Sequence, residues 1–267
     1  MNIIDGKKIR NTLLEKYETD IKNNNYKMKL AIIQIGLDQA SEIYIRNKIK
    51  VCSSLNIDSD VYKYQDISKG DLKRLINKLN KDTAITGIMI ELPLPKQFDE
   101  EEVLNWISPY KDVDGLCRQN KVVPCTAKAV IEILKYHKIS LKQRIVLIGY
   151  SKLIGKPLEK YFLDHNIVPI ICNTKTNNLK EKTKNADIII TATGVKNILT
   201  SDMVKDNVVI IDCGIIKEQN RVRGDTDFEA LKEKSKLITP VPNGVGPVTT
   251  AMVVKNLISL YQEQIDK

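Results

Sequence analysis

Apolar, largely β-branched runs alternate with segments of helical spacing along the whole chain. In the first half, two apolar runs and one alternating run between them are separated by two helical segments, and the third run ends at Pro93. This βαβαβ order predicts a small parallel sheet with an N-terminal helix packed on it. The predicted strands are 29–36, 60–65 and 85–92, and the predicted helices are 4–24, 40–55 and 71–80.

A second series of apolar runs follows in the C-terminal half. These runs are apolar at almost every position, which is typical of a sheet covered on both faces, so they predict a doubly wound parallel sheet. Residues 111–124 have no strong periodic pattern and form the predicted crossing between two domains, and residues 249–264 form a last helix. The predicted strands are 144–149, 168–173, 186–194, 208–214 and 236–241.

One lysine stands on the apolar side of its predicted helix. On a helical wheel at about 100° per residue, Lys48 falls in the apolar arc, one turn from Tyr44, whereas Lys50 falls in the polar arc. Two interpretations are open. Lys48 lays its stem on the surface and sends its ammonium to water, or it is desolvated in a pocket and prepared for acid–base chemistry. The apolar arc holds Tyr44, Ile45, Ile49, Val51, Cys52 and Leu55, and the polar arc holds Arg46, Asn47, Lys50, Ser53 and Ser54.

Composition and charge narrow the class of protein. The 267 residues, 42% hydrophobic and 28% charged, leave room for two domains. The net charge of +9 suits a nucleic-acid binder, but the lysines are dispersed and only three Phe and one Trp could stack on bases, so we expect anionic small molecules and no nucleic acid as partners. The charged N-terminus and short apolar runs predict no secretory signal and no membrane span. The five cysteines form no C-x-x-C pair, which predicts a cytoplasmic protein without a metal site.

A glycine-containing turn follows the first strand of the second series. The stretch 149–157 reads GYSKLIGKP and lacks the full G-x-G-x-x-G pattern. Gly149 nevertheless permits a tight turn, Ser151 can donate to a phosphate, and Gly155 allows helix and strand to approach closely. At the start of a doubly wound sheet, this turn predicts a nucleotide site.

The end of the next strand indicates which nucleotide binds. NAD sites usually place an acidic residue there for the ribose hydroxyl, but this chain has Thr174 and Lys175. A hydroxyl and a positive charge suit a 2′-phosphate, so we expect NADP. The alternative interpretation is that both are ordinary turn residues.

Three further stretches combine rigid or glycine-containing loops with carboxylates. ELPLP (91–95) ends a buried strand, KDVDG (111–115) places two carboxylates in a loop, and PVPNGVGPVT (240–249) precedes the last helix. Taken singly, either Asp of KDVDG is as well explained as a turn residue. Together with ASEIYIRNKIK (40–50), PCT (124–126), GYSKLIGKP, VVIIDCGI and the Gly224–Asp225 pair, these stretches resemble the methylenetetrahydrofolate dehydrogenase/methenyltetrahydrofolate cyclohydrolase family over nearly the whole chain.

The resemblance implies an α/β protein of two domains with a cleft between them. An N-terminal α/β/α catalytic, folate-binding domain is expected in residues 1–120 with 249–267, and a C-terminal Rossmann-like, NADP-binding domain, a doubly wound parallel sheet, in residues 121–248. It implies a bifunctional enzyme of one-carbon metabolism and purine biosynthesis. Such an enzyme oxidises 5,10-methylenetetrahydrofolate to the methenyl cation with NADP and hydrolyses that cation to 10-formyltetrahydrofolate. Its expected partners are tetrahydrofolate derivatives, and its expected assembly is a homodimer.

The family's site residues carry over by motif. Its cyclohydrolase lysine maps onto Lys48, its stacking tyrosine onto Tyr44 and its pterin-holding aspartate onto Asp114, and Glu91 completes the predicted catalytic set. A lysine in a partly apolar cleft has a lowered pKa, so its neutral amine can take a proton from the attacking water near pH 7. The predicted substrate contacts are Tyr44, Lys48, Leu92, Pro93, Asp114, Pro247 and Thr250. The predicted cofactor contacts are Gly149, Tyr150, Ser151, Gly155, Pro157, Thr174, Lys175, Thr193, Gly194, Gly214 and Ile215.

Glu91 is the departure that bears most directly on activity, because the family normally has Gln there. An ionised Glu91 touching Lys48 favours the ammonium, raises the lysine pKa and weakens the base. A protonated Glu91 behaves much like the amide. The first case predicts the alternative function, a dehydrogenase with weakened cyclohydrolase activity, and the sequence leaves both cases open.

Other departures concern the rim of the site and the cofactor. Tyr150 stands where many relatives carry Arg, which keeps NAD as an alternative to NADP. The loop 116–123 is shorter than in the family, PCTAKA loses a proline and a glycine, and Asn243 replaces a usual glycine. A different class, a basic non-catalytic binding protein on the same fold, is opposed by the retention of Tyr44, Lys48, KDVDG and the glycine turn.

Overall fold

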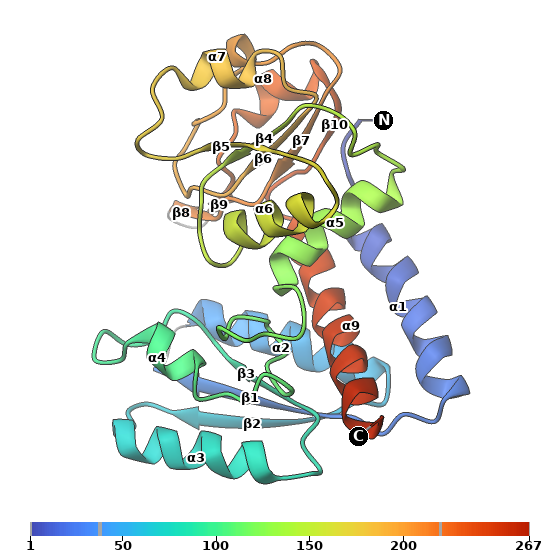
Figure 1. The fold of residues 1–267 in the computed structure, drawn as a ribbon, viewed down its shortest axis with the longest axis vertical. Helices are drawn as coiled ribbons and strands as arrows, with labels where there is room; N and C mark the ends of the chain where they lie inside the picture. The colour runs from blue at the N-terminus through green and yellow to red at the C-terminus, as the bar shows by residue number, and fades with distance from the viewer. Residues whose placement is uncertain (1, 37–38, 219–220, 267) are drawn as a thin grey trace. The chain divides into compact units, whose positions relative to one another are not determined.

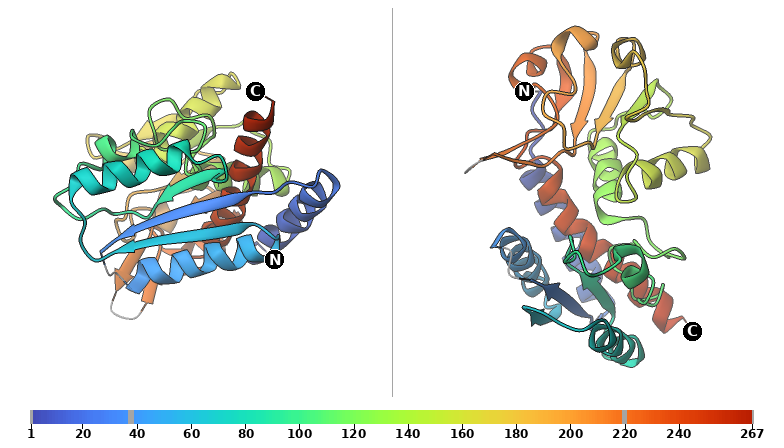
Figure 2. Two further views of the ribbon diagram at one scale, coloured as in Figure 1. Left: turned by 90° about the horizontal axis from the view of Figure 1, so that it is seen from below. Right: turned by 90° about the vertical axis from the view of Figure 1, so that its left-hand side faces the viewer.

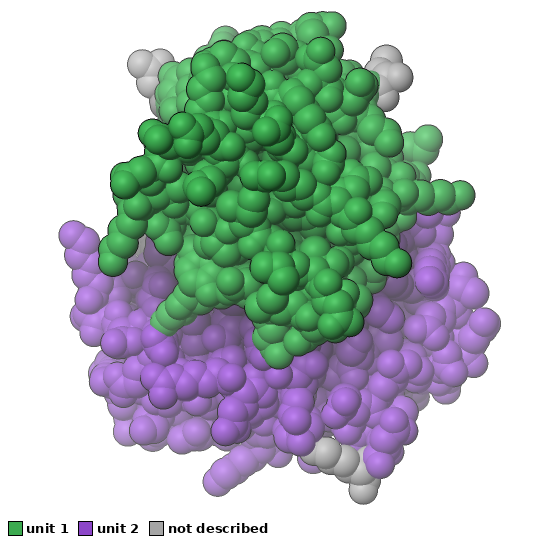
Figure 3. Space-filling model, turned by 45° about the horizontal axis from the view of Figure 1, so that its top comes forward, with its two compact units in different colours: residues 1–11, 126–249 green, residues 12–125, 250–267 purple. Residues whose placement is uncertain are grey.

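The chain folds into two compact units. The computed structural model describes residues 2–36, 39–218 and 221–266. Unit 1 comprises residues 1–11 and 126–249, and unit 2 comprises residues 12–125 and 250–267, as coloured in Figure 3. The predicted domains differ from these units chiefly at the N-terminus, since they assign residues 1–11 to the folate-binding domain. The helices α1 (Gly6–Asn23) and α9 (Val245–Ile265) each contribute residues to both units.

Unit 2 contains a three-stranded sheet in the order β2-β1-β3. Both strand pairs are parallel and both connections carry a helix, so the predicted βαβαβ order is confirmed (Figure 1). The predicted N-terminal helix is α1. The elements are β1 (Lys29–Ile35), α2 (Gln39–Ser54), β2 (Asp58–Tyr64), α3 (Lys69–Lys81), β3 (Gly87–Ile90) and α4 (Glu100–Leu104).

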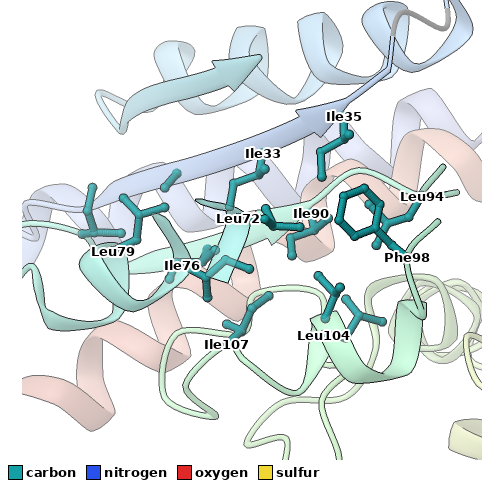
Figure 4. Packing of buried hydrophobic residues seen from close by; sticks show 14 residues of the cluster. Ile33, Ile35, Leu72, Ile76, Leu79, Ile90, Leu94, Phe98, Leu104 and Ile107 are labelled. Atoms are coloured by element: carbon teal, nitrogen blue, oxygen red, sulfur yellow. The ribbon is translucent and has the colours of Figure 1, made fainter. Parts of the chain in front are cut away.

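One face of this sheet packs on α3. Successive side chains of a strand point to opposite faces. Ile33 and Ile35 of β1 point toward α3, into a cluster of buried apolar side chains that is called the α3 cluster (Figure 4). Helix α3 contributes Leu72, Ile76 and Leu79, which helical spacing brings to one side. Each fully buried side chain of this size contributes about 1.5–3 kcal/mol, so this face is the structural core. The opposite face is left for α2 (Figure 2).

Unit 1 contains a five-stranded sheet in the order β10-β7-β6-β4-β5, with every pair parallel. The chain moves one way from β4 to β5 and the other way to β6 and β7, which places the crossover segments on opposite faces. The predicted doubly wound sheet is therefore confirmed. The elements are α5 (Cys125–Tyr136), β4 (Ile145–Ile148), α6 (Gly155–Asp164), β5 (Ile170–Cys172), α7 (Leu179–Thr183), β6 (Ile188–Thr191), η1 (Ser201–Met203), β7 (Val208–Asp212), α8 (Phe228–Lys232) and β10 (Ser235–Ile238).

Two of the differences from the predictions concern a short strand pair and the start of the last helix. Strands β8 (Ile216–Glu218) and β9 (Arg221–Arg223) form an antiparallel pair that was not predicted, because three-residue strands are too short to show a period. Helix α9 begins at Val245, four residues before its predicted start at 249. Pro247 is tolerated in that first turn, where its missing N–H deprives the helix of no hydrogen bond.

Candidate active site

Helix α2 covers the sheet face opposite α3 and carries the lysine singled out above. The predicted apolar arc faces inward, since Ile45, Cys52 and Leu55 are buried, whereas Lys50 of the polar arc is exposed. Tyr44 is the exception in that arc, because its side chain is 41% exposed. An exposed aromatic ring one turn from Lys48 is suited to packing against a flat ligand.

Lys48 is desolvated and ion-paired. Its Nζ lies 2.7 Å from Oε2 of Glu91, and the two side chains are 15% and 9% exposed. Glu91 follows β3 directly, and its N–H donates to the carbonyl of Ile33 at 2.9 Å. Strand alternation then directs its carboxylate to the α2 side of the sheet. The interpretation of Lys48 as a lysine that sends its ammonium to bulk water is therefore wrong.

A second carboxylate, Asp114, acts on the same ammonium. Burial lowers the pKa of Lys48, but the negative charges of Asp114 and Glu91 outweigh it, so the pKa stands above its ordinary value. Of the two cases that the sequence left open, the structure agrees with the one in which Glu91 touches Lys48 and raises its pKa, and the charge of Asp114 adds to that effect. For Asp114, burial raises the pKa to about 6, against the opposing effect of the Lys48 charge. Lys48 is thus held as an ammonium between acids.

In the KDVDG loop, Lys111 and Asp112 bond to the backbone, whereas Asp114 acts on Lys48. Lys111 is buried, and its Nζ donates to two backbone carbonyls at the C-terminal end of α3. The Asp112 carboxylate accepts from two backbone N–H groups of the following turn, at 3.0 and 2.7 Å. The interpretation as a turn residue therefore holds for Asp112. Asp114 is the carboxylate left to act on Lys48.

The other predicted substrate contacts lie in two places. Leu92 and Pro93 directly follow Glu91, and Leu92 is half-buried whereas Pro93 is exposed. Pro247 and Thr250 lie in the first turns of α9 and are both half-buried. Pro247 belongs to unit 1 and Thr250 to unit 2. The role of these four residues in binding stays a prediction.

All predicted cofactor contacts lie after the carboxyl ends of four strands of unit 1. Because the strands are parallel, these ends share one edge of the sheet, which is where doubly wound sheets bind ligands. This edge is called the carboxyl edge. Gly149, Tyr150, Ser151, Gly155 and Pro157 follow β4, Thr174 and Lys175 follow β5, Thr193 and Gly194 follow β6, and Gly214 and Ile215 follow β7.

Glycine is required at two positions of the turn after β4. Gly149 has φ +104°, and a Cβ there would lie 2.3 Å from the carbonyl oxygen of Ala192. A Cβ at Gly155 would lie 2.3 Å from the carbonyl oxygen of Gly149. The tight turn and the close approach predicted at these positions are confirmed. Ser151 accepts from the N–H of Ile154 at 3.2 Å, which holds its hydroxyl beside the start of α6.

Two buried carboxylates, neither of them a predicted site residue, organise the loops of the carboxyl edge. The Asp225 carboxylate accepts from the N–H groups of Thr193 at 2.6 Å and Gly194 at 2.8 Å. The Asp212 carboxylate accepts from the N–H groups of Gly214 at 2.9 Å and Asp225 at 3.0 Å. Burial raises the pKa of Asp225, although these donors oppose the rise. The Gly224–Asp225 pair in the sequence was the available signal for this network.

Cationic side chains lie close to the predicted phosphate-binding residues. The ring of Tyr150 lies under the ammonium of Lys156, 5.5 Å from Nζ to the ring centroid. Tyr150 also donates its hydroxyl to Glu159. Lys175 is exposed on a turn in which its N–H donates to the Asn173 side chain at 2.9 Å. Lys156 is a candidate that sequence reasoning missed, since any lysine can lie on a solvated face.

The chemistry of the carboxyl edge fits a dinucleotide. The N-terminus of α6 favours an anion, and at Gly194 the space that a Cβ would fill is open. Tyr150, Val195 and Ile215 expose apolar surface there, 39%, 51% and 55% respectively, as expected for a site that packs on flat rings. In the described ranges, no group of three or more His, Cys, Asp or Glu side chains could hold a metal ion.

Within residues 2–36, 39–218 and 221–266, no helix has both the length and the apolar character needed to cross a bilayer. The longest helix, α9, has 21 residues, but it includes polar positions such as Lys255 and Asn256.

Comparison with known families gives two adjoining matches. Residues 4–114 match the tetrahydrofolate dehydrogenase/cyclohydrolase catalytic domain, and residues 124–265 match the tetrahydrofolate dehydrogenase/cyclohydrolase NAD(P)-binding domain. The first match contains Lys48, Glu91 and Asp114, and the second contains the whole carboxyl edge. The two matched ranges therefore contain the residues of both sites described above.

Individual proteins agree with these matches. The chain is 42% identical over 270 residues to the bifunctional protein FolD of Caldanaerobacter subterraneus, covering 97% of this chain and 96% of that protein. A solved bifunctional 5,10-methylenetetrahydrofolate dehydrogenase/cyclohydrolase from Thermoplasma acidophilum has a TM-score of 0.95 at 35% identity, covering 99% and 100%. The bifunctional enzyme FolD of Campylobacter jejuni has a TM-score of 0.93 at 35% identity, covering 98% and 99%.

Proposed function

Because this chain belongs to the tetrahydrofolate dehydrogenase/cyclohydrolase family, we propose that it catalyses both reactions that the family's name gives. It oxidises 5,10-methylenetetrahydrofolate with NADP and hydrolyses the resulting methenyl cation to 10-formyltetrahydrofolate. NADP, when bound at the carboxyl edge, accepts the hydride. The predicted domain boundaries, homodimer and cytoplasmic location stay predictions.

The observation that carries the hydrolytic half is the buried Lys48, 2.7 Å from Glu91 and within the field of Asp114. Water attacking the methenyl carbon must lose a proton, and a neutral Lys48 amine can take it. The bond from that carbon to its ring nitrogen then breaks as the O–H proton is released to solvent and the formyl C=O forms, and the proton held by Lys48 returns to the nitrogen. Asp114 can accept N–H bonds from the pterin ring, and Tyr44 can pack against it.

The rival function is a dehydrogenase with weakened cyclohydrolase activity. It is favoured by the contact between Glu91 and Lys48, since two carboxylates raise the lysine pKa and reduce the neutral fraction. A cationic folate beside Lys48 acts in the opposite direction and lowers that pKa. The two functions therefore differ in the rate of hydrolysis and share the same site.

The test supplies the purified enzyme with methenyltetrahydrofolate alone and follows the loss of its absorbance. A second assay supplies methylenetetrahydrofolate with NADP or NAD and follows reduced cofactor. Acceleration of both reactions supports the bifunctional proposal. NADP reduction without accelerated hydrolysis supports the rival, and neither activity contradicts both.

Glu91→Gln is expected to increase hydrolysis. Removing one of the two carboxylates lowers the Lys48 pKa, and each unit of lowering gives about ten times more neutral amine at pH 7. The rising limb of the pH–rate profile should therefore move to lower pH, and the rate at pH 7 should rise by about tenfold. Glu102→Gln, on the neighbouring α4, is the matched control, because its carboxylate pairs with Lys69 in an exposed ion pair. A slower Glu91→Gln enzyme with an unmoved profile would contradict the base role of Lys48.

Lys175→Gln is expected to weaken NADP selectively. If Lys175 contacts the 2′-phosphate, its loss should raise KM for NADP by about tenfold, because a charge-assisted bond contributes about 1.5–3 kcal/mol. KM for NAD should change little. Lys180→Gln, on the helix that follows, is the control, and an equal effect on both cofactors would remove Lys175 from phosphate recognition.

A further inference from the structure

Gln34 is a buried polar side chain that the mechanism above leaves unused. The residue is 2% exposed, and neither its Nε2 nor its Oε1 has a hydrogen-bond partner among the described residues. Buried amides are normally paired, because an unpaired polar group loses its bonds to water without replacement. Gln34 is an exception to this rule, and it lies in β1, the central strand of its sheet.

The direction of Gln34 follows from strand alternation. Its neighbours in β1, Ile33 and Ile35, point into the α3 cluster (Figure 4). Gln34 therefore points to the opposite face of the sheet, the face that α2 covers (Figure 2). Lys48 approaches the sheet from this same face.

The register places Gln34 beside Glu91. Ile33 pairs with Ile90 of β3, and the N–H of Glu91 donates to the carbonyl of Ile33, so the next residue along each strand is Gln34 and Glu91. On the other side Gln34 pairs with Lys63 of β2. The row across the sheet thus reads Glu91, Gln34, Lys63.

Helix α2 pairs with both ends of this row. Lys48 reaches Glu91 at 2.7 Å, and Glu42 reaches Lys63 at 3.2 Å. Gln34 stands between these two ion pairs as the uncharged member. The charged or titratable groups that act on Lys48 are Glu91, Asp114 and Cys125.

We propose that Gln34 is a positioning residue for the Lys48–Glu91 pair, and that its side-chain N–H donates to the Glu91 carboxylate whenever Lys48 releases it. This inference rests on the proposed hydrolytic function of Lys48. To act as a base, the amine must give up its proton, which leaves a buried carboxylate without its cation. Leaving such a charge unpaired is costly, and an amide on the adjacent strand offsets that cost. While Lys48 is protonated, its ammonium stays bound to the Glu91 carboxylate, because a charged donor binds a carboxylate more strongly than the neutral Gln34 amide does.

The first test is Gln34→Leu, which keeps the approximate size and removes the donor. Without the amide, Glu91 depends more strongly on the ammonium, so the rising limb of the hydrolysis profile should move to higher pH by about one unit, and the rate at pH 7 should fall by about tenfold. In a Glu91→Gln background, Gln34→Leu should not move the rising limb of the profile any further, since residue 91 then has no carboxylate for Gln34 to bind. An equal shift in both backgrounds would overturn the proposal.

The second test does not need activity. Brief acetic anhydride labelling at a series of pH values, read by mass spectrometry, gives the titration midpoint of Lys48, with exposed Lys50 on the same helix as internal reference. Gln34→Leu should raise the Lys48 midpoint and leave that of Lys50 unchanged. An unmoved Lys48 midpoint overturns the role of Gln34. If the parent enzyme lacks hydrolysis, the proposed function fails while the labelling still decides this point, and Gln34→Met replaces Gln34→Leu if the latter does not fold.

Discussion

Lys48→Met is expected to remove the hydrolytic activity almost completely. A positioned general base contributes about 10²–10⁴ in rate, and among the described residues no other amine lies against Glu91. Methionine keeps most of the stem, so the packing of α2 on the sheet should persist. The measurement is the decay of methenyltetrahydrofolate absorbance at saturating substrate, from about pH 6 to pH 9.

The control for this substitution is Lys50→Met, two residues along the same helix. Lys50 lies in the polar arc and is exposed, so its variant should hydrolyse at the parent rate. If Lys48→Met retains most of its activity, water is activated elsewhere and the hydrolytic proposal is wrong. If both variants lose activity equally, the cause is damage to α2 and the comparison does not support a base.

Asp225→Ala is expected to impair cofactor use strongly. Its carboxylate accepts from the N–H groups of Thr193 and Gly194, and each donor left unpaired costs about 1–3 kcal/mol. The loop after β6 should then lose its fixed geometry at the carboxyl edge. We expect KM for NADP to rise by about 10–100-fold, measured by initial rates of NADP reduction.

Hydrolysis provides the internal control for Asp225→Ala. Lys48, Glu91 and Asp114 all belong to unit 2, whereas Asp225 belongs to unit 1, so hydrolysis without NADP should persist. Asp227→Ala is the matched variant, because Asp227 stands before α8 without a side-chain capping bond. Parallel loss of both activities in Asp225→Ala would indicate unfolding, and an unchanged KM would remove Asp225 from cofactor positioning.

Local pattern was sufficient for much of the fold. The alternation of apolar runs and helical spacing predicts both parallel sheets, because each buried strand or helix face shows its own period. The wheel of α2 likewise separates Ile45 and Cys52 from Lys50. Among the elements that were not predicted, β8 and β9 have three residues each and show no period.

Pattern was weaker at the site, because partners there are distant in sequence. The wheel singles out Lys48, and KDVDG and the Gly224–Asp225 pair point to the loops that matter. Neither the wheel nor these motifs indicate that Asp112 closes a turn while Asp114 acts on Lys48. Burial alone predicts a lowered Lys48 pKa and contact with an ionised Glu91 predicts a raised one, so the direction of the shift depended on a contact that only the fold shows.

The sequence by itself determined the order of the elements, the buried face of each one and the glycines that the carboxyl edge requires, because these depend on neighbours within a few positions. Only the tertiary structure decided that Lys48 meets Glu91, that Asp225 holds the loop after β6 and that Gln34 lies unpaired beside the ion pair. The Lys48–Glu91 contact joins residues 43 positions apart, and the two Asp225 contacts join residues 31 and 32 positions apart. These contacts depend on strand register, which local periodicity does not encode.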